Sequence, residues 1–135
     1  MNEKSYSLDD AAVVGHIDML QGIIGRMSSN CSNCKTWAVT VVAAILALSD
    51  YSGWQRFWIC CGPIVLFFFI DSFYLGLERR FICLQRMFIA DINDGMHVIP
   101  YTIESTTAKE QLTGMLKGFI SLSTTPFYIL LVIIL

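Results

Sequence analysis

Two apolar segments separated by a short linker constrain this chain more than any other feature. The first runs from Thr36 to Ser49 and the second from Phe57 to Leu77, where a charged Glu-Arg-Arg triplet follows. The second segment reaches the length of about 20 residues that a helix needs to cross a bilayer core. The chain is also 55% hydrophobic and only 15% charged. The sequence therefore predicts an all-α membrane protein built as one domain, residues 1–135, around a transmembrane helical hairpin.

The charges around the two segments predict their orientation. The expected spans cover residues 35–51 and 57–77, and Arg56 is the only Lys or Arg between the apolar segments. The other basic residues precede the first apolar segment or follow the second: Lys4, Arg26, Lys35, Arg79, Arg80, Arg86, Lys109 and Lys117. Because positive charge stays on the cytoplasmic side during insertion, we expect a multi-pass protein with a cytoplasmic N-terminus and an external turn near Asp50–Arg56.

An amphipathic helix is predicted over residues 7–30, with Ser7 as its cap. Its apolar residues recur every three or four positions, which is typical of one helical face, and Gly22 permits close approach of another helix. This stripe either lies on the membrane or packs on the hairpin, or it forms oligomers or binds a partner. Residues 28–35 form either a turn or a polar stretch of one continuous helix. The stripe consists of Val13, Ile17, Leu20, Ile24 and Met27.

Asp71 is the most unusual residue of the second span. A carboxylate inside a membrane is costly and is a functional candidate for that reason. One reading is structural, in which Asp71 accepts hydrogen bonds from Tyr74 or Ser72 or is reached by Arg79 or Lys35. The other readings are a pore-lining or oligomer contact, or proton or ion coupling. We expect an intramembrane polar and assembly site made of Asp71, Tyr74, Glu78 and Arg79.

The second half of the chain is predicted to return to the membrane. Residues 78–117 form a cytoplasmic segment that is broken at Asn93-Asp94-Gly95. It starts either as a basic juxtamembrane helix at the inner surface or as a continuation of the second span that packs on the N-terminal helix. Val98–Thr107 is either a short strand or an extended connector. Residues 118–135 lack charges and are long enough for a third transmembrane helix, in which Pro126 introduces a bend. A re-entrant or monolayer-embedded segment is the alternative.

Chemical motifs are scarce, so we expect no enzyme activity and no cofactor. The sequence has no phosphate-binding glycine loop and no HExxH motif. Cys31 and Cys34 form a single CxxC pair, whereas zinc needs four ligands, so no metal site is expected. No basic stripe interleaved with aromatic residues is present, so direct nucleic-acid binding is not expected either.

Three short patterns carry a resemblance to known proteins. They are Arg26-Met27 with Asn30, then Lys35-Thr36-Trp37-Ala38-Val39-Thr40, and then Asp71, Tyr74-Leu75 and Leu77-Glu78-Arg79. Over about residues 15–85 the chain resembles small bacterial inner-membrane proteins that act as membrane effectors of antiphage defence operons, including retron-linked two-transmembrane effectors. The resemblance implies a toxic effector of abortive infection, held inactive by a cytoplasmic partner, that permeabilises or depolarises the inner membrane after release and assembly.

The partners that follow from this resemblance are membrane lipid, further copies of the chain and a cytoplasmic sensor complex, such as a reverse transcriptase with its nucleic acid. Two other functions stay open on the sequence. One is a non-toxic membrane anchor or accessory subunit that recruits a cytoplasmic complex. The other is a small ion or proton channel or transporter.

Overall fold

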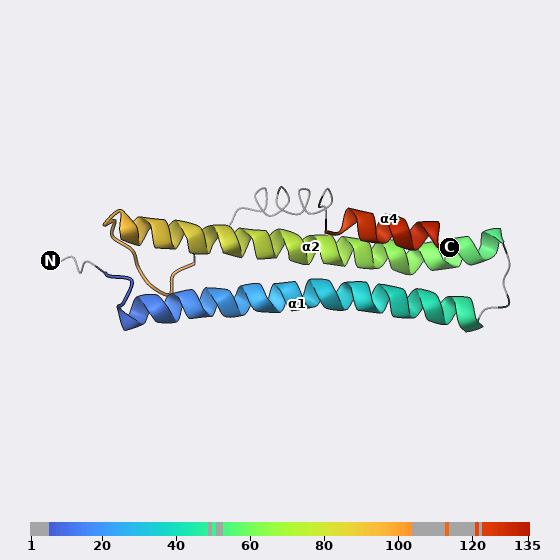
Figure 1. The fold of residues 1–135 in the computed structure, drawn as a ribbon, viewed down its shortest axis with the longest axis horizontal. Coiled ribbons are helices and arrows are strands. Elements are labelled where there is room, and N and C mark those ends of the chain that lie inside the picture. The colour runs from blue at the N-terminus through green and yellow to red at the C-terminus, as the bar shows by residue number, and fades with distance from the viewer. Residues whose placement is uncertain (1–5, 49, 51–52, 104–112, 114–120, 122) are drawn as a thin grey trace.

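Two long helices, paired as an antiparallel hairpin, dominate the structure (Figure 1). The computed structural model describes residues 6–48, 50, 53–103, 113, 121 and 123–135. In this part of the chain the helices are α1 (Ala11–Leu48), α2 (Trp54–Asn93) and α4 (Thr125–Ile133). The short α4 lies along α2, in the half of the hairpin that contains the α1–α2 connection (Figure 1). The predicted all-α hairpin is confirmed.

Helix α1 combines two elements that could have been separate according to the sequence. The predicted helix over residues 7–30 and the predicted span over residues 35–51 are parts of one continuous helix of 38 residues. Hydroxyls inside it bond to the preceding turn: Thr36 Oγ1 donates to the Ser32 carbonyl at 3.1 Å, and Thr40 Oγ1 donates to the Thr36 carbonyl at 2.8 Å. Polar side chains therefore fit within the helix without breaking it.

The start of α1 corrects the predicted cap at Ser7. The helix begins at Ala11, and the main-chain carbonyl of Asp10 accepts hydrogen bonds from Val13 and Val14 at 2.9 and 3.0 Å. The Asp10 carboxylate also accepts the Ser7 N–H at 2.8 Å. Asp10 thus occupies the boundary of the helix, and Ser7 belongs to the turn before it, because a carboxylate at this position favours the positive end of the helix dipole.

Helix α2 confirms the predicted continuation past Glu78. It runs for 40 residues, through Pro63, and ends at Asn93. Gly95 adopts the left-handed backbone (φ +71°), the Gly95 N–H donates to the Ile92 carbonyl, and the Met96 N–H donates to the Asp91 carbonyl. This pair of bonds is the Schellman arrangement, which satisfies the last carbonyls of a helix.

Both long helices are long and apolar enough to cross a membrane. At 1.5 Å per residue, α1 and α2 are about 57 and about 60 Å long, whereas a bilayer core is about 30 Å thick. About half of each helix therefore extends beyond the length that a membrane requires.

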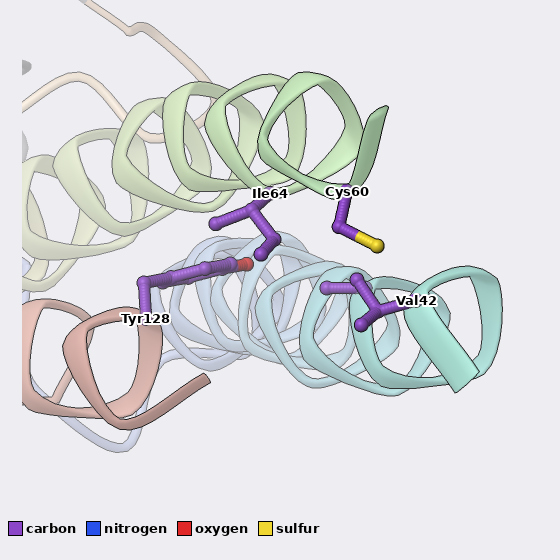
Figure 2. Packing of buried hydrophobic residues seen from close by; sticks show 5 residues of the cluster. Val42, Cys60, Ile64 and Tyr128 are labelled. Atoms are coloured by element: carbon purple, nitrogen blue, oxygen red, sulfur yellow. The ribbon is translucent and has the colours of Figure 1, made fainter. Parts of the chain in front are cut away.

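The hairpin contains two apolar clusters, one toward each end. Near the connection, Ala38 and Val42 of α1 meet Cys60 and Ile64 of α2 and Tyr128 of α4. Figure 2 shows Val42, Cys60, Ile64 and Tyr128 pointing into the space between the three helices. At the other end, a smaller cluster joins α1 and α2 to the segment after α2 and consists of Val13, Ile92 and Val98.

The C-terminal segment differs from the predicted third span. The helix α4 has nine residues and starts at Thr125, and the described residues before it, Ser121, Ser123 and Thr124, are not helical. Pro126 lies in its first turn, where proline starts a helix and does not bend it. By itself α4 is about 13 Å long, which is too short to span a bilayer core. Residues 118–120 and 122 of the predicted span lie outside the described residues.

The predicted strand or connector over Val98–Thr107 is only partly covered. Val98 and Ile99 are irregular, a turn follows at Pro100 and Tyr101, and residues 104–107 lie outside the described residues. The described part is therefore a connector.

Candidate functional site

A buried ion pair joins the two long helices between the apolar clusters. The Lys35 ammonium of α1 lies 2.8 Å from Oδ2 of Asp71 in α2. The Asp71 side chain is fully buried, whereas 22% of the Lys35 side chain is exposed. Next to the pair, the Cys31 thiol donates to the Asp71 main-chain carbonyl at 3.7 Å. Of the partners considered for Asp71, Lys35 is the one that contacts it in the structure. This contact fixes the register of α1 against α2.

Several buried polar atoms near this pair lack a hydrogen-bond partner among the described residues. They are Oδ1 of Asp71 and three hydroxyls: those of Ser72, Thr124 and Tyr128. Tyr128 belongs to the same cluster as Ala38 and Ile64, and its ring lies 5.4 Å from that of Phe68. A buried polar group without a partner costs about 1–3 kcal/mol. The junction of α1, α2 and α4 therefore holds polar groups whose burial destabilises an otherwise apolar hairpin.

The other predicted site residues of α2, Tyr74, Glu78 and Arg79, lie between Asp71 and the end of the hairpin far from the connection. Tyr74 and Glu78 are half-buried, and no hydrogen bond joins either of them to Asp71 among the described residues. Arg79 donates from Nη2 to the Ser121 hydroxyl at 2.7 Å, so it ties α2 to the segment that enters α4. The structure brings Lys35 to Asp71, and it assigns Arg79 to a different contact.

The apolar stripe of the N-terminal half faces α2. Val13 and Leu20 are buried, Ile17 packs on the cluster of Val13, Ile92 and Val98, and Leu20 lines a recess that α2 also lines. Ile24 and Met27 are half-buried, whereas Gly22 is exposed, with no atom near the position of an added Cβ. Of the predicted alternatives, packing on the hairpin is the one that this arrangement shows.

Three arginines lie at one level of the hairpin. Arg26 lies nine residues before Lys35 on α1, and Arg80 lies nine residues after Asp71 on α2, both on the side away from the connection. Arg79 precedes Arg80. Because the helices are antiparallel, these residues lie at similar heights, about 14 Å from the ion pair. The same level is about 33 Å from the end of α1 at Leu48, which is close to the thickness of a bilayer core.

A second polar contact, which was not predicted from the sequence, closes the far end of the hairpin. His16 is buried, its ring lies 4.2 Å from that of Phe88, and its Nδ1 accepts the Tyr101 main-chain N–H at 2.9 Å. Tyr101 holds a left-handed backbone (φ +64°), and its hydroxyl lies where a Cβ on Gly15 would project. The position of His16 between Val13 and Leu20 on the apolar stripe was the available signal, because such spacing places it on the packed face.

The His16 contact predicts that the far end of the hairpin weakens in acid. Burial lowers the pKa of His16 below its ordinary value of 6.5. As the pH falls below 6.5, this imidazole takes up a proton more readily in the unfolded chain than in the folded chain. The free energy of unfolding therefore decreases as the pH decreases. Above that pH, His16 contributes no pH dependence. Circular dichroism in detergent, from about pH 7.5 to about pH 5, measures the unfolding midpoint that this effect lowers.

His97 supplies the matched control for that measurement, because its side chain is exposed. The variant His16→Gln is expected to lose the pH dependence below 6.5, and His97→Gln is expected to keep it. A pH dependence of equal size in His16→Gln would show that another group causes the effect.

Comparisons with protein-family models, curated proteins and solved structures found no match to this chain.

Proposed function

We propose that this chain is a toxic membrane effector of a bacterial antiphage system, which inserts its hairpin into the inner membrane and permeabilises or depolarises it after release from a cytoplasmic partner. In this proposal the hairpin crosses the bilayer between the level of Arg26 and the α1–α2 connection, a stretch that contains residues 35–48 and 57–77. The end of the hairpin that holds His16 lies in the cytoplasm. The placement in antiphage defence rests on the resemblance of residues 15–85 to retron-linked membrane effectors. The mechanism rests on the contacts of the hairpin.

The observation that carries the proposal is the buried Lys35–Asp71 pair inside an apolar hairpin. A membrane anchor needs only apolar length, and apolar residues in place of a buried ion pair are often neutral or stabilising. A charged pair at this depth is therefore a cost that anchoring does not explain. The Asp71 oxygen and the three hydroxyls, which have no partner within the described part of the chain, add to that cost.

Assembly of several copies supplies what the single hairpin lacks. Neighbouring hairpins, or water admitted between them, can satisfy these polar atoms, so the free energy of the polar junction favours the assembled state over the single one. In such an assembly Asp71 and Lys35 border a polar path through the membrane. Exposed apolar side chains along the hairpin suit contact with lipid or with another copy in the same region: Trp37, Val39, Val65, Leu66, Phe69 and Phe73.

Expression of the chain without its partner tests this function. We expect growth arrest and loss of membrane potential, measured with a potential-sensitive dye, within the time that the protein accumulates in the membrane. The variant Asp71→Asn removes the charge with little change of volume, and it is expected to abolish depolarisation while the protein still inserts. Unchanged growth and membrane potential at high expression of the unaltered chain would contradict the proposal.

A non-toxic anchor that recruits a cytoplasmic complex is the second candidate. The exposed apolar side chains of Met96, Ile99 and Tyr101, at the end of the hairpin far from the connection, favour it. An anchor is expected to bring a cytoplasmic partner to the membrane without any change of membrane potential. The same dye measurement therefore separates the two candidates.

A further inference from the structure

The end of the hairpin far from the connection is mostly acidic. We call the described residues 6–20 and 87–103 the tip. No Lys or Arg occurs among these described residues, and five aspartates do: Asp9, Asp10, Asp18, Asp91 and Asp94. The basic level of Arg26, Arg79 and Arg80 lies closer to the ion pair, and Arg86, which is level with Leu20, borders the tip. The hairpin is therefore basic at that level and acidic at its end.

The tip also exposes several large apolar side chains. Exposed fractions reach 63% for Ile99, 58% for Met96 and Tyr101, and 55% for Met87. Under the proposed insertion, Ala11 lies about 22 Å beyond the level of Arg26, and therefore in water. Apolar side chains grouped on a surface of this kind mark a binding site for another molecule.

A recess of about 290 Å³ opens in the tip between α1, α2 and the segment after α2. Apolar residues form most of its wall, and the polar residues of the lining are His16, Asp91, His97 and Thr102. No salt bridge joins Asp91 to a basic group within the described residues. An aliphatic stem that ends in a cation matches such a lining, because the stem packs on Leu20, Met87 and Phe88 while the charge pairs with Asp91.

Two other occupants conflict with the charge of the tip. The cytoplasmic leaflet is anionic and attracts basic segments, so it repels this group of aspartates. A second copy docked tip to tip brings the same aspartates together, and like charges across an interface cost free energy. A basic protein surface has neither conflict.

We infer that the tip binds a basic segment of a cytoplasmic protein, with one Arg or Lys side chain in the recess and its charge on Asp91. This inference deepens the proposed function, on which it rests, by naming the surface and the chemistry through which the partner holds the hairpin. The buried stripe of Val13 and Leu20 is then the support of the docking surface, and the exposed residues around the recess make the contact.

Binding of a defined peptide tests the recess. The full chain is placed in nanodiscs of phosphatidylcholine, which is zwitterionic, and the probe is a fluorescent peptide of alternating arginine and alanine. We expect Asp91→Asn to raise the Kd about fivefold or more, because a charge-assisted contact is lost. Asp94→Asn is the matched control, since it removes the same charge from an exposed residue that does not line the recess. Its effect is expected to be under about twofold.

Three results of this experiment would overturn the inference. They are equal losses in Asp91→Asn and Asp94→Asn, equal binding of a peptide of alternating glutamate and alanine, and binding that empty nanodiscs reproduce. Circular dichroism of each variant confirms that the helices are intact. Asp18→Asn, on the exposed side of α1, provides a second control of the same charge.

Photo-cross-linking in cells then tests the class of partner. A benzoylphenylalanine at Ile99 is expected to give an adduct with a protein through an Arg- or Lys-containing segment, and Asp91→Arg is expected to abolish it. Replacement of the cross-linked basic residue by Glu is expected to restore the adduct to Asp91→Arg. An adduct with a second copy of the chain, with lipid alone, or without such rescue contradicts the inference. The depolarisation assay is independent of these outcomes, so toxicity without tip binding would overturn the inference and leave the proposed function standing.

Discussion

Replacement of Lys35 by methionine is expected to destabilise the hairpin by about 3–5 kcal/mol, because the Asp71 carboxylate then stays buried without its partner. The expectation follows from the 2.8 Å contact and the complete burial of Asp71. Unfolding of the detergent-solubilised protein with increasing sodium dodecyl sulfate, followed by circular dichroism, measures the change in free energy. The single variant isolates the cost of an unpaired buried charge, which differs from the net value of the pair.

The double variant Lys35→Met with Asp71→Leu is the matched control. It removes both charges and keeps apolar volume at both positions, so its stability is expected to equal or exceed that of the unaltered chain. Under the proposed function it is also expected to be folded but non-toxic, since the polar path is gone. A double variant as unstable as Lys35→Met would show that volume or shape, and not charge, accounts for the loss.

Replacement of Leu20 by alanine has the second-largest expected effect, about 2–5 kcal/mol of destabilisation in the part of the hairpin outside the spans. Leu20 is 1% exposed and lines the recess with residues of α2. Hydrogen exchange is expected to show faster opening of α1 around Leu20, while the amides near Ala38 keep their protection.

Val14→Ala provides the comparison, because Val14 is on the same helix and 44% exposed. Its effect is expected to be under about 1 kcal/mol, as for other exposed positions. The pair of variants also tests how the stripe is used. If Leu20→Ala leaves exchange unchanged but alters the oligomeric state, the stripe binds another chain and not α2.

The sequence was sufficient to predict the hairpin and its extension, because both depend on local properties. Apolar length predicted the two apolar stretches that pair in the hairpin, and the Asn93-Asp94-Gly95 break marked the end of α2. The continuity of α1 across residues 28–35 was left undecided, because serine and asparagine are weak helix formers whose fate depends on context. The structure resolves this, since Thr36 and Thr40 bond to the preceding turn and Cys31 and Cys34 are buried.

The contacts between elements were harder to predict, because they depend on register. Lys35 was one of several groups within reach of Asp71, and only the antiparallel alignment of α1 with α2 selects it. The bond between His16 and Tyr101 joins positions 85 residues apart. No pattern within one segment indicates such a pair. The start of α4 at Thr125 likewise reflects Pro126, which fits the first turn of a helix better than its interior.

The unbroken course of α1 gives the hairpin a mechanical property. Under the proposed insertion, a rigid rod crosses the inner face of the membrane near Arg26, with an arm of about 22 Å in the cytoplasm and an arm of about 33 Å in the bilayer. A tilt imposed on the short arm therefore displaces the outer end by about one and a half times as much, in the opposite direction. Under the proposed function, a protein bound to the tip would thus control the separation of neighbouring hairpins at the outer face without any contact inside the membrane.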